Sequence, residues 1–147
     1  MAQKVGDIVK GKDLTVVHRE QSVWDVARLM VTKNIGAVPV LDGDRLVGIF
    51  SERDLMTRVI VAGKYPQRTP VGEVMTRELV VAEAEESVET CVHRMQQINA
   101  RHLPVVSGGT LIGMVSMRDL LQIGLEAKDE EIKHLTAYIH YIPPGYT

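Results

Sequence analysis

A short polar motif, Ser-x-Arg-Asp, occurs twice in the 147-residue chain, at residues 51–54 and again at residues 116–119. A carboxylate accepts two hydrogen bonds at once, so Asp54 and Asp119 suit the paired hydroxyls of a ribose. The arginine of each copy presents a fixed positive fork that matches a phosphate. The serine hydroxyl can bond either group. Two such motifs in one small domain suggest two related sites.

Each copy of the motif follows an apolar run, residues 46–50 in the first copy and 111–115 in the second. A hydrophobic strand that runs into Ser-x-x-Asp is typical of a strand feeding a helix start. Such a start offers free backbone N–H groups and the positive end of the helix dipole, which suit an anion. Ser-x-x-Asp is also a helix capping box, and an arginine beside an aspartate can form a surface ion pair, so the motif alone fits a structural role as well.

The motif belongs to a longer internal repeat with a period of 65 residues. Between residues 22 and 56, thirteen positions are identical to their partners 65 residues later. These positions are Ser22, Val23, Met30, Asn34, Pro39, Val40, Gly43, Leu46, Gly48, Ser51, Arg53, Asp54 and Leu55. Each unit spans roughly half the chain and is too short to bury a good core alone, so the two units are expected to pack together.

The hydrophobic pattern predicts the order βαββα in each repeat. After Ser22 and after Ser87, apolar residues recur at i, i+3, i+4 and i+7, which indicates an amphipathic helix. The crossover through this helix should be right-handed. The expected strands are residues 14–17, 38–41 and 46–50 in the first repeat and 79–81, 103–106 and 111–115 in the second. Pro39 and Pro104 predict an edge or strand-start position for the second strand, where a missing N–H is harmless.

Segments outside the repeats complete an α/β (α+β) fold. Residues 5–10 and 70–76 resemble each other and predict short helical lead-ins that each pack on the neighbouring unit. Residues 127–142 predict an extra C-terminal helix with an apolar stripe. The expected division is a first repeat with its lead-in at residues 1–66, a second repeat at 67–125, and a C-terminal helix and tail at 126–147.

Composition narrows the class of protein. With 17 Lys and Arg against 19 Asp and Glu, and only 4% aromatic residues, the chain lacks the features of a nucleic-acid binder. No apolar run reaches the length of a membrane span, and the N-terminus lacks the apolar region of a signal peptide, so a cytoplasmic location is expected. The single cysteine, Cys91, excludes an internal disulfide and a cysteine-based zinc cluster. The five histidines show no metal-ligand spacing, so no metal site is expected.

These elements, in this order and twice over, resemble a tandem cystathionine-β-synthase (CBS) domain pair, or Bateman module. In the second repeat the resemblance rests on Val74-Met75-Thr76, Ser87-Val88, Leu103-Pro104-Val105-Val106 and the run from Leu111 to Leu120. The first repeat departs at Ile8-Val9-Lys10, where Met-Thr is usual. The match covers about residues 5–124 and is similar to the small stand-alone CBS-pair proteins of bacteria.

The resemblance implies a non-catalytic regulatory module whose two repeats pack about a pseudo-twofold axis and leave two clefts. Many relatives bind adenosine compounds there, namely AMP, ADP, ATP, NAD or S-adenosylmethionine. An adenosine nucleotide is therefore expected as a regulatory ligand, and no required cofactor is expected. A homodimer is expected, with an unidentified regulated protein as a further partner. The alternative is a protein-interaction or scaffold module with vestigial clefts.

The repeats differ where Arg101 and His102 replace Gly36 and Ala37, and in relatives a basic pair at this place reaches the nucleotide phosphates. The main cleft is expected to hold phosphate and ribose on Arg101, His102, Ser116, Arg118 and Asp119, and the base against Lys10, Thr15, Ile35, Gly36 and Ala37. The second cleft would use Ser51, Arg53, Asp54, Leu79 and Ala100. Because it lacks a basic pair, it is expected to bind more weakly, or to hold another part of a larger ligand such as a dinucleotide.

Overall fold

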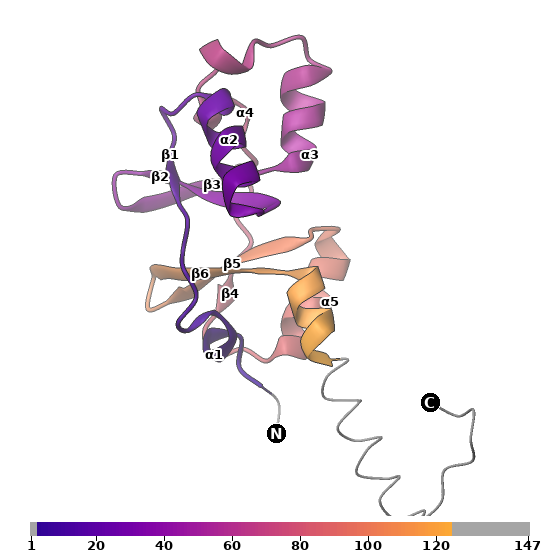
Figure 1. The fold of residues 1–147 in the computed structure, drawn as a ribbon. Helices are drawn as coiled ribbons and strands as arrows, with labels where there is room; N and C mark the ends of the chain where they lie inside the picture. The colour runs from indigo at the N-terminus through magenta and orange to yellow at the C-terminus, as the bar shows by residue number, and fades with distance from the viewer. Residues whose placement is uncertain (1–2, 125–147) are drawn as a thin grey trace, which may run out of the picture.

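The computed structural model describes residues 3–124, which form two similar lobes stacked on one another (Figure 1). Each lobe contains one three-stranded sheet, and the two sheets adjoin at the centre of the molecule with helices on their outer sides (Figure 1). The lobes repeat the same elements about a pseudo-twofold axis, as the sequence repeat predicts. The expected C-terminal helix at residues 127–142 lies outside the described residues.

The first repeat has the predicted βαββα order. Its elements are β1 (Val17–His18), α2 (Val23–Lys33), β2 (Ala37–Asp42), β3 (Arg45–Ser51) and a last helix that starts as α3 (Glu52–Asp54) and continues as a π-helical turn (Leu55–Ile60). The second repeat has β4 (Ala82–Glu83), α5 (Val88–Ile98), β5 (His102–Ser107), β6 (Thr110–Ser116) and a helix at residues 117–124. A short 3₁₀ helix (Pro66–Arg68) lies in the linker between the repeats.

Local sequence signals set the two crossover helices. Ser22 accepts a hydrogen bond from the backbone N–H of Asp25 at 3.1 Å and so caps α2, and Asn34 ends the helix in the left-handed region at φ 54°. Ser87 and Asn99 do the same for α5. A serine N-cap and an asparagine at the C-terminal end satisfy backbone groups that the helix leaves unpaired. The buried faces are Val23, Val26 and Met30 in α2 and Val88, Cys91 and Met95 in α5.

The expected edge or strand-start position of the two prolines is wrong, because each proline is the third residue of a central strand. The strand orders are β1-β2-β3 and β4-β5-β6, so β2 and β5 are central. The parallel pairing with the preceding strand begins only one residue after each proline, at Val40 and at Val105. Because proline has no N–H to donate, the parallel ladder stops there. This also explains why β1 begins at Val17 rather than at Leu14, leaving residues 14–16 outside the sheet. The expected strand at residues 79–81 is likewise wrong, because β4 begins only at Ala82, opposite Val105.

The lead-in helices exchange between the lobes, as predicted. Helix α1 (Val5–Val9) packs into the core of the second lobe, where the Val5 N–H donates to the carbonyl of Glu86 at 2.9 Å. Helix α4 (Val71–Val74) packs into the core of the first lobe, with the Gly72 N–H donating to the carbonyl of Arg19 at 2.9 Å. Each core thus contains residues from both repeats, which ties the lobes together.

One glycine in each hairpin permits the close approach of these lead-ins. A Cβ added to Gly113 would lie 2.5 Å from the Cβ of Val9, and one added to Gly48 would lie 2.5 Å from the sulfur of Met75. Real Cβ atoms are never so close to another heavy atom, so any side chain here would push the lead-in away. The repeat of this glycine at the 65-residue offset therefore follows from the lobe-to-lobe exchange.

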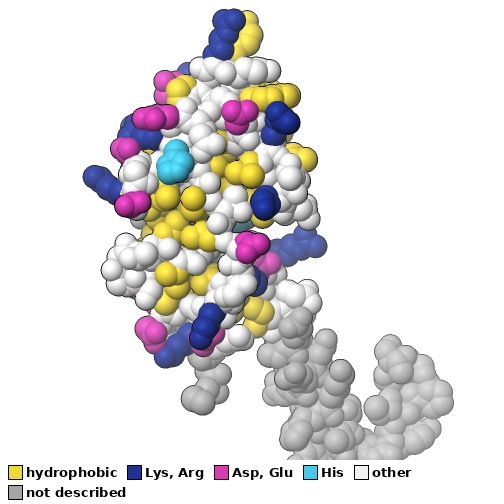
Figure 2. Space-filling model, turned by 60° about the vertical axis from the view of Figure 1, so that its left-hand side comes forward, with side chains coloured by type: hydrophobic (Ala, Val, Ile, Leu, Met, Phe, Trp, Pro, Cys, Tyr) yellow, Lys and Arg dark blue, Asp and Glu magenta, His cyan; other side chains and the backbone are white. Residues whose placement is uncertain are grey.

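The surface carries both signs of charge. On the face in Figure 2, acidic and basic side chains are interspersed over both lobes, and hydrophobic side chains gather where the lobes meet. Within residues 3–124, no helix is long and apolar enough to cross a membrane.

Candidate functional site

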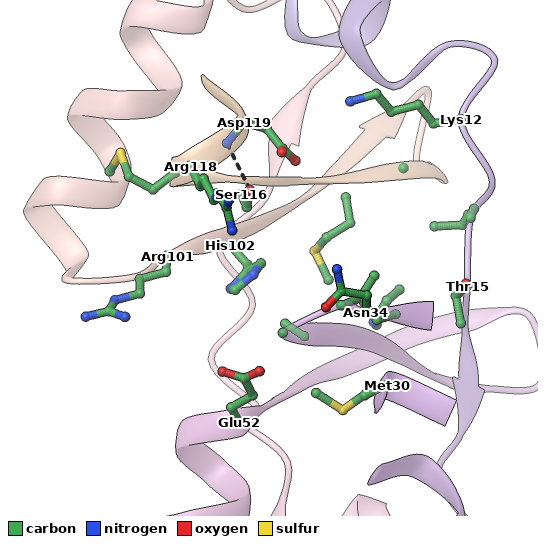
Figure 3. Close-up of a pocket in the computed structure, with 18 of the residues that line it drawn as sticks. Lys12, Thr15, Met30, Asn34, Glu52, Arg101, His102, Ser116, Arg118 and Asp119 are labelled. Atoms are coloured by element: carbon green, nitrogen blue, oxygen red, sulfur yellow. Dashed lines mark hydrogen bonds between the residues drawn. The ribbon is translucent and has the colours of Figure 1, made fainter. Parts of the chain in front are cut away.

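A cavity of about 1320 Å³ lies between the two lobes and takes its walls from both repeats (Figure 3). All residues predicted for the main cleft line this cavity except Lys10. They are Thr15, Ile35, Gly36, Ala37, Arg101, His102, Ser116, Arg118 and Asp119. The fold therefore brings together two groups of residues that are about 65 to 100 positions apart in the chain.

Lys10 lies elsewhere, at a smaller cavity of about 350 Å³ that also includes Lys4 and Glu85. Helix α1 ends at Val9, and the chain then turns through Gly11 with φ 79°. After this turn Lys12 lines the large cavity, and Figure 3 shows its side chain among the lining residues. The position of the turn is set by how α1 docks on the other lobe. The sequence pattern therefore pointed to Lys10, whereas the lysine that lines the large cavity is Lys12.

The second copy of the motif has an open carboxylate. Ser116 Oγ accepts a hydrogen bond from the backbone N–H of Asp119 at 3.0 Å, which caps the helix at residues 117–124. The Met117 N–H donates to the carbonyl of Arg101 at 2.7 Å, which holds the helix start against the segment before β5. The Asp119 side chain is exposed and makes no hydrogen bond within residues 3–124. Asp119 therefore presents both carboxylate oxygens to the cavity.

The first copy of the motif is closed by the protein itself. Asp54 is 6% exposed, and its Oδ2 accepts hydrogen bonds from the Ser51 N–H at 3.0 Å and from Ser51 Oγ at 3.1 Å. Its Oδ1 accepts from Thr76 Oγ1 at 3.0 Å and lies 3.5 Å from Arg58 Nε. The capping-box interpretation thus describes this copy well, because the carboxylate is fully engaged in structural bonds.

None of the five residues predicted for the second cleft lines either cavity described above. These are Ser51, Arg53, Asp54, Leu79 and Ala100. Leu79 is 38% exposed, and the Arg53 carbonyl accepts a hydrogen bond from Thr57 Oγ1 at 2.8 Å. The two copies of the motif are therefore alike in backbone structure and unlike in what their aspartates can bind.

Apolar side chains from both lobes form much of the rest of the main cavity. Met30 and Pro39 come from the first repeat, and Met114 and Leu121 come from the second. Methionine and proline side chains adapt well to the flat face of an aromatic ring. Sequence reasoning assigned Met30 to the helix core and Pro39 to the sheet, and both residues also reach the cavity.

Glu52 is a charged lining residue that the motif analysis passed over, because it occupies the variable position after Ser51. In Figure 3 its carboxylate points toward His102 across the boundary between the lobes. Gly36 lies between them: a Cβ there would be 3.5 Å from His102 Cε1 and 3.6 Å from Glu52 Cδ. Burial lowers the pKa of His102, an effect that the negative charges of Glu52 and Asp119 oppose and the positive charge of Arg101 adds to.

Comparison with known proteins identifies the architecture. The sequence profile of the CBS domain matches residues 5–61 and 71–126. The chain is 34% identical over 146 residues to "CBS domain-containing protein CBSX3, mitochondrial" of Arabidopsis thaliana, covering 92% of this chain and 71% of that protein. A putative signal-transduction protein with CBS domains from Burkholderia ambifaria MC40-6 superposes with a TM-score of 0.80 at 35% identity, covering 84% of this chain and 95% of that one.

A more distant likeness extends to a ligand complex. The CBS domain pair of protein MJ0100, solved with 5′-methylthioadenosine and S-adenosyl-L-methionine, superposes with a TM-score of 0.75 at 24% identity, covering 86% of this chain and 99% of that one. At 24% identity, this similarity shows that the two proteins share a fold and nothing more. From the matched profile, the two exchanged lobes and the solved relatives, the chain belongs to the CBS domain family and is a tandem CBS domain pair, a module of the regulatory, signal-transduction type.

Proposed function

We propose that this chain is a non-catalytic sensor that binds an adenosine nucleotide, such as AMP, ADP, ATP or NAD, in the cavity between its two repeats. The observation that carries the proposal is the Asp119 carboxylate, which lies exposed at a capped helix start on the wall of the cavity.

The ribose is assigned to Asp119. Its two carboxylate oxygens match two neighbouring hydroxyls, and Ser116 lies at the same edge of the cavity. Charge-assisted hydrogen bonds of this kind are about twice as strong as neutral ones. The ribose is the part of the ligand that all adenosine compounds share, so this contact recognises the class rather than one member.

The phosphate is assigned to the basic side chains of the second repeat. Arg118 is next to Asp119 in the helix start, and Arg101 and His102 lie before and at the start of β5. Arginine forks and the positive end of the helix at residues 117–124 both favour a phosphate group. Of the basic side chains among the described residues that line the cavity, all except Lys12 belong to the second repeat.

The base is assigned to the first-repeat wall. Ile35, Gly36 and Ala37 form the segment that leads into β2, and Thr15 lies in the segment before β1, outside the sheet. Backbone groups of strands that are not paired in a sheet can bond to the edge of a base, and Pro39 and Met30 supply apolar surface for its face. The adenosine complex of MJ0100 supports the assignment only as an example of what this fold can hold.

The second cleft, with Ser51, Arg53, Asp54, Leu79 and Ala100, is proposed to bind weakly. Asp54 already accepts its hydrogen bonds from Ser51 and Thr76, so a ribose would have to displace them. Breaking buried hydrogen bonds to a charged group costs about 1.5–3 kcal/mol each. The protein should therefore take up one ligand per chain at ordinary concentrations.

Transmission of the signal would use the arrangement of the lobes. A ligand that touches both walls favours one angle between them, and a partner protein can read that angle. A homodimer in the cytoplasm is part of this proposal. It is supported by exposed apolar side chains on the last helix of each repeat, where Met56, Ile60 and Leu121 are 65%, 60% and 52% exposed.

A thermal-shift panel with AMP, ADP, ATP, NAD, NADH and S-adenosylmethionine tests the function. A ligand at 100 times its dissociation constant should stabilise the fold by about 2.7 kcal/mol. The Asp119→Asn variant should lose this shift, and the matched Asp44→Asn variant, which changes an exposed aspartate outside the cavity, should keep it. Absence of a shift with all six compounds would favour the scaffold alternative.

A further inference from the structure

Among residues 3–124, the charged side chains that line the main cavity are balanced in sign. The cations of this part of the wall are Lys12, Arg101 and Arg118, and the anions are Asp13, Glu52 and Asp119. His102 adds little positive charge near neutral pH, because its burial disfavours the charged form. A site built for a chain of phosphates would need a clear excess of positive charge. The described residues of the cavity wall do not supply that excess.

Glu52 is the anion that lies where the phosphates are expected. It is the first residue of α3 and faces His102 across the lobe boundary, and its side chain makes no hydrogen bond within the described residues (Figure 3). The pseudo-equivalent position in the second repeat is Met117, which is uncharged. The carboxylate is therefore a feature of one repeat alone, on the wall opposite the cations of the other.

Size does not select the ligand in this cavity. A volume of about 1320 Å³ exceeds the roughly 300–1,000 Å³ of a typical small-molecule site. A second or third phosphate would fit in the space, so any discrimination between AMP and ATP must come from charge. A chain of phosphates extending from Arg118 and His102 toward the first lobe would approach Glu52.

We propose that Glu52 makes the site favour adenosine compounds that carry no more than one phosphate. The inference rests on the function proposed above and names the ligand class for the same cavity. The Glu52 side chain is exposed to solvent, so the repulsion is screened. Two like charges about 5 Å apart then repel enough to weaken binding about fourfold to tenfold, so we expect this effect from the one added phosphate that comes nearest to Glu52.

Calorimetric titration of the full chain with adenosine, AMP, ADP and ATP, in buffer containing EDTA, tests this assignment. In the unmodified protein, AMP should bind more tightly than ADP, and ADP more tightly than ATP. Glu52→Gln should tighten ATP binding about fourfold to tenfold, AMP binding less, and adenosine binding not at all. Glu89→Gln is the matched control, because Glu89 also lies in the first turn of a serine-capped helix but is outside the cavity.

Three results overturn the assignment, and a fourth overturns the function on which it rests. ATP binding as tightly as AMP to the unmodified protein would show that the cavity does not discriminate by charge. An equal change for all four compounds in Glu52→Gln would show a structural effect. Tightening of ATP binding by Mg²⁺ that Glu52→Gln abolishes would make Glu52 a cation ligand instead. Failure of all four compounds to bind the unmodified protein would instead overturn the proposed function itself.

Discussion

Thr76 donates a hydrogen bond from Oγ1 to Oδ1 of Asp54 at 3.0 Å, and this contact closes one of the two repeated motifs. Thr76 follows the lead-in helix α4, so the bond depends on the exchange of lead-ins between lobes. The lead-in of the other lobe has Lys10 at the corresponding place, and Lys10 lies away from the main cavity. One aspartate of the repeat has thus become structural, and the other remains open to a ligand.

The two aspartates should therefore respond oppositely to the same substitution. Asp54→Asn should lower the free energy of unfolding by about 1–3 kcal/mol, because it weakens buried hydrogen bonds to a charged group. Asp119→Asn should change stability by less than about 0.5 kcal/mol but weaken AMP binding about tenfold or more. Urea unfolding and calorimetric titration of both variants measure the contrast. Similar stability losses in the two variants would contradict the difference between the motifs.

Substitution of Thr76 tests the same contact from its other side. Thr76→Val keeps the shape of the side chain and removes its hydroxyl, so it should destabilise the protein by about 1–2 kcal/mol. Thr57→Val is a control, since the Thr57 hydroxyl donates to a backbone carbonyl at an exposed position and should matter less. Equal losses for the two valine variants, read from urea midpoints, would argue against a special role for Thr76.

The close approach of α1 to β6 predicts a strong effect at one glycine. Gly113→Ala would place a Cβ 2.5 Å from Val9, so α1 must move and the free energy of unfolding should fall by about 1–3 kcal/mol. Gly124→Ala is the matched control, because no atom of residues 3–124 lies within 4 Å of its added Cβ and alanine favours the helix there. Thermal unfolding in which Gly113→Ala is as stable as Gly124→Ala would contradict the packing described.

His102 should make stability depend on pH. Burial lowers its pKa below the usual value of 6.5, so the unfolded chain binds more protons than the folded one between the two values. The free energy of unfolding should therefore decrease as the pH falls below about 6.5 and level off beneath the folded-state pKa. His102→Gln should lack this component, whereas His93→Gln, at an exposed helix position, should keep it. Identical pH profiles for the two variants would exclude this role.

The same histidine should couple AMP binding to proton uptake. A bound phosphate favours the charged imidazolium and raises the pKa of His102. The AMP phosphate itself takes up a proton at about pH 6, so the comparison is made with His102→Gln. As the pH falls from about 7 toward 5.5, the affinity of the unmodified protein for AMP should increase relative to that of His102→Gln. Titrations in buffers with different heats of ionisation measure the protons taken up. An identical pH dependence in the two proteins would contradict placement of the phosphate near His102.

Much of the fold could be predicted from the sequence because its determinants are local. The caps at Ser22 and Asn34, the helical spacing of Val23, Val26 and Met30, and their second copies specify the elements within each repeat. The lead-ins were predictable because residues 5–10 and 70–76 look alike. The strand order was not, since the central position of β2 depends on where its parallel partner stops, and Pro39 fits the pattern of an edge strand equally well.

The candidate site could be predicted where the repeat marks it and not where distant segments meet. Arg101 and Asp119 stand out through comparison of the two copies, and both line the cavity. Lys12 and Glu52 reach it because of the turn at Gly11 and the stacking of the lobes, which no local pattern encodes. The closure of Asp54 by Thr76 likewise joins residues from different repeats.

A crystal structure of the protein grown with AMP tests the central claim most directly. We expect one AMP per chain in the cavity between the lobes, with both ribose hydroxyls within hydrogen-bond distance of the Asp119 carboxylate and the phosphate on the side of Arg118 and His102. The Asp54 carboxylate should keep its bond to Thr76. AMP bound at Asp54, or a cavity that stays empty at saturating AMP while Asp119 remains open, would contradict it.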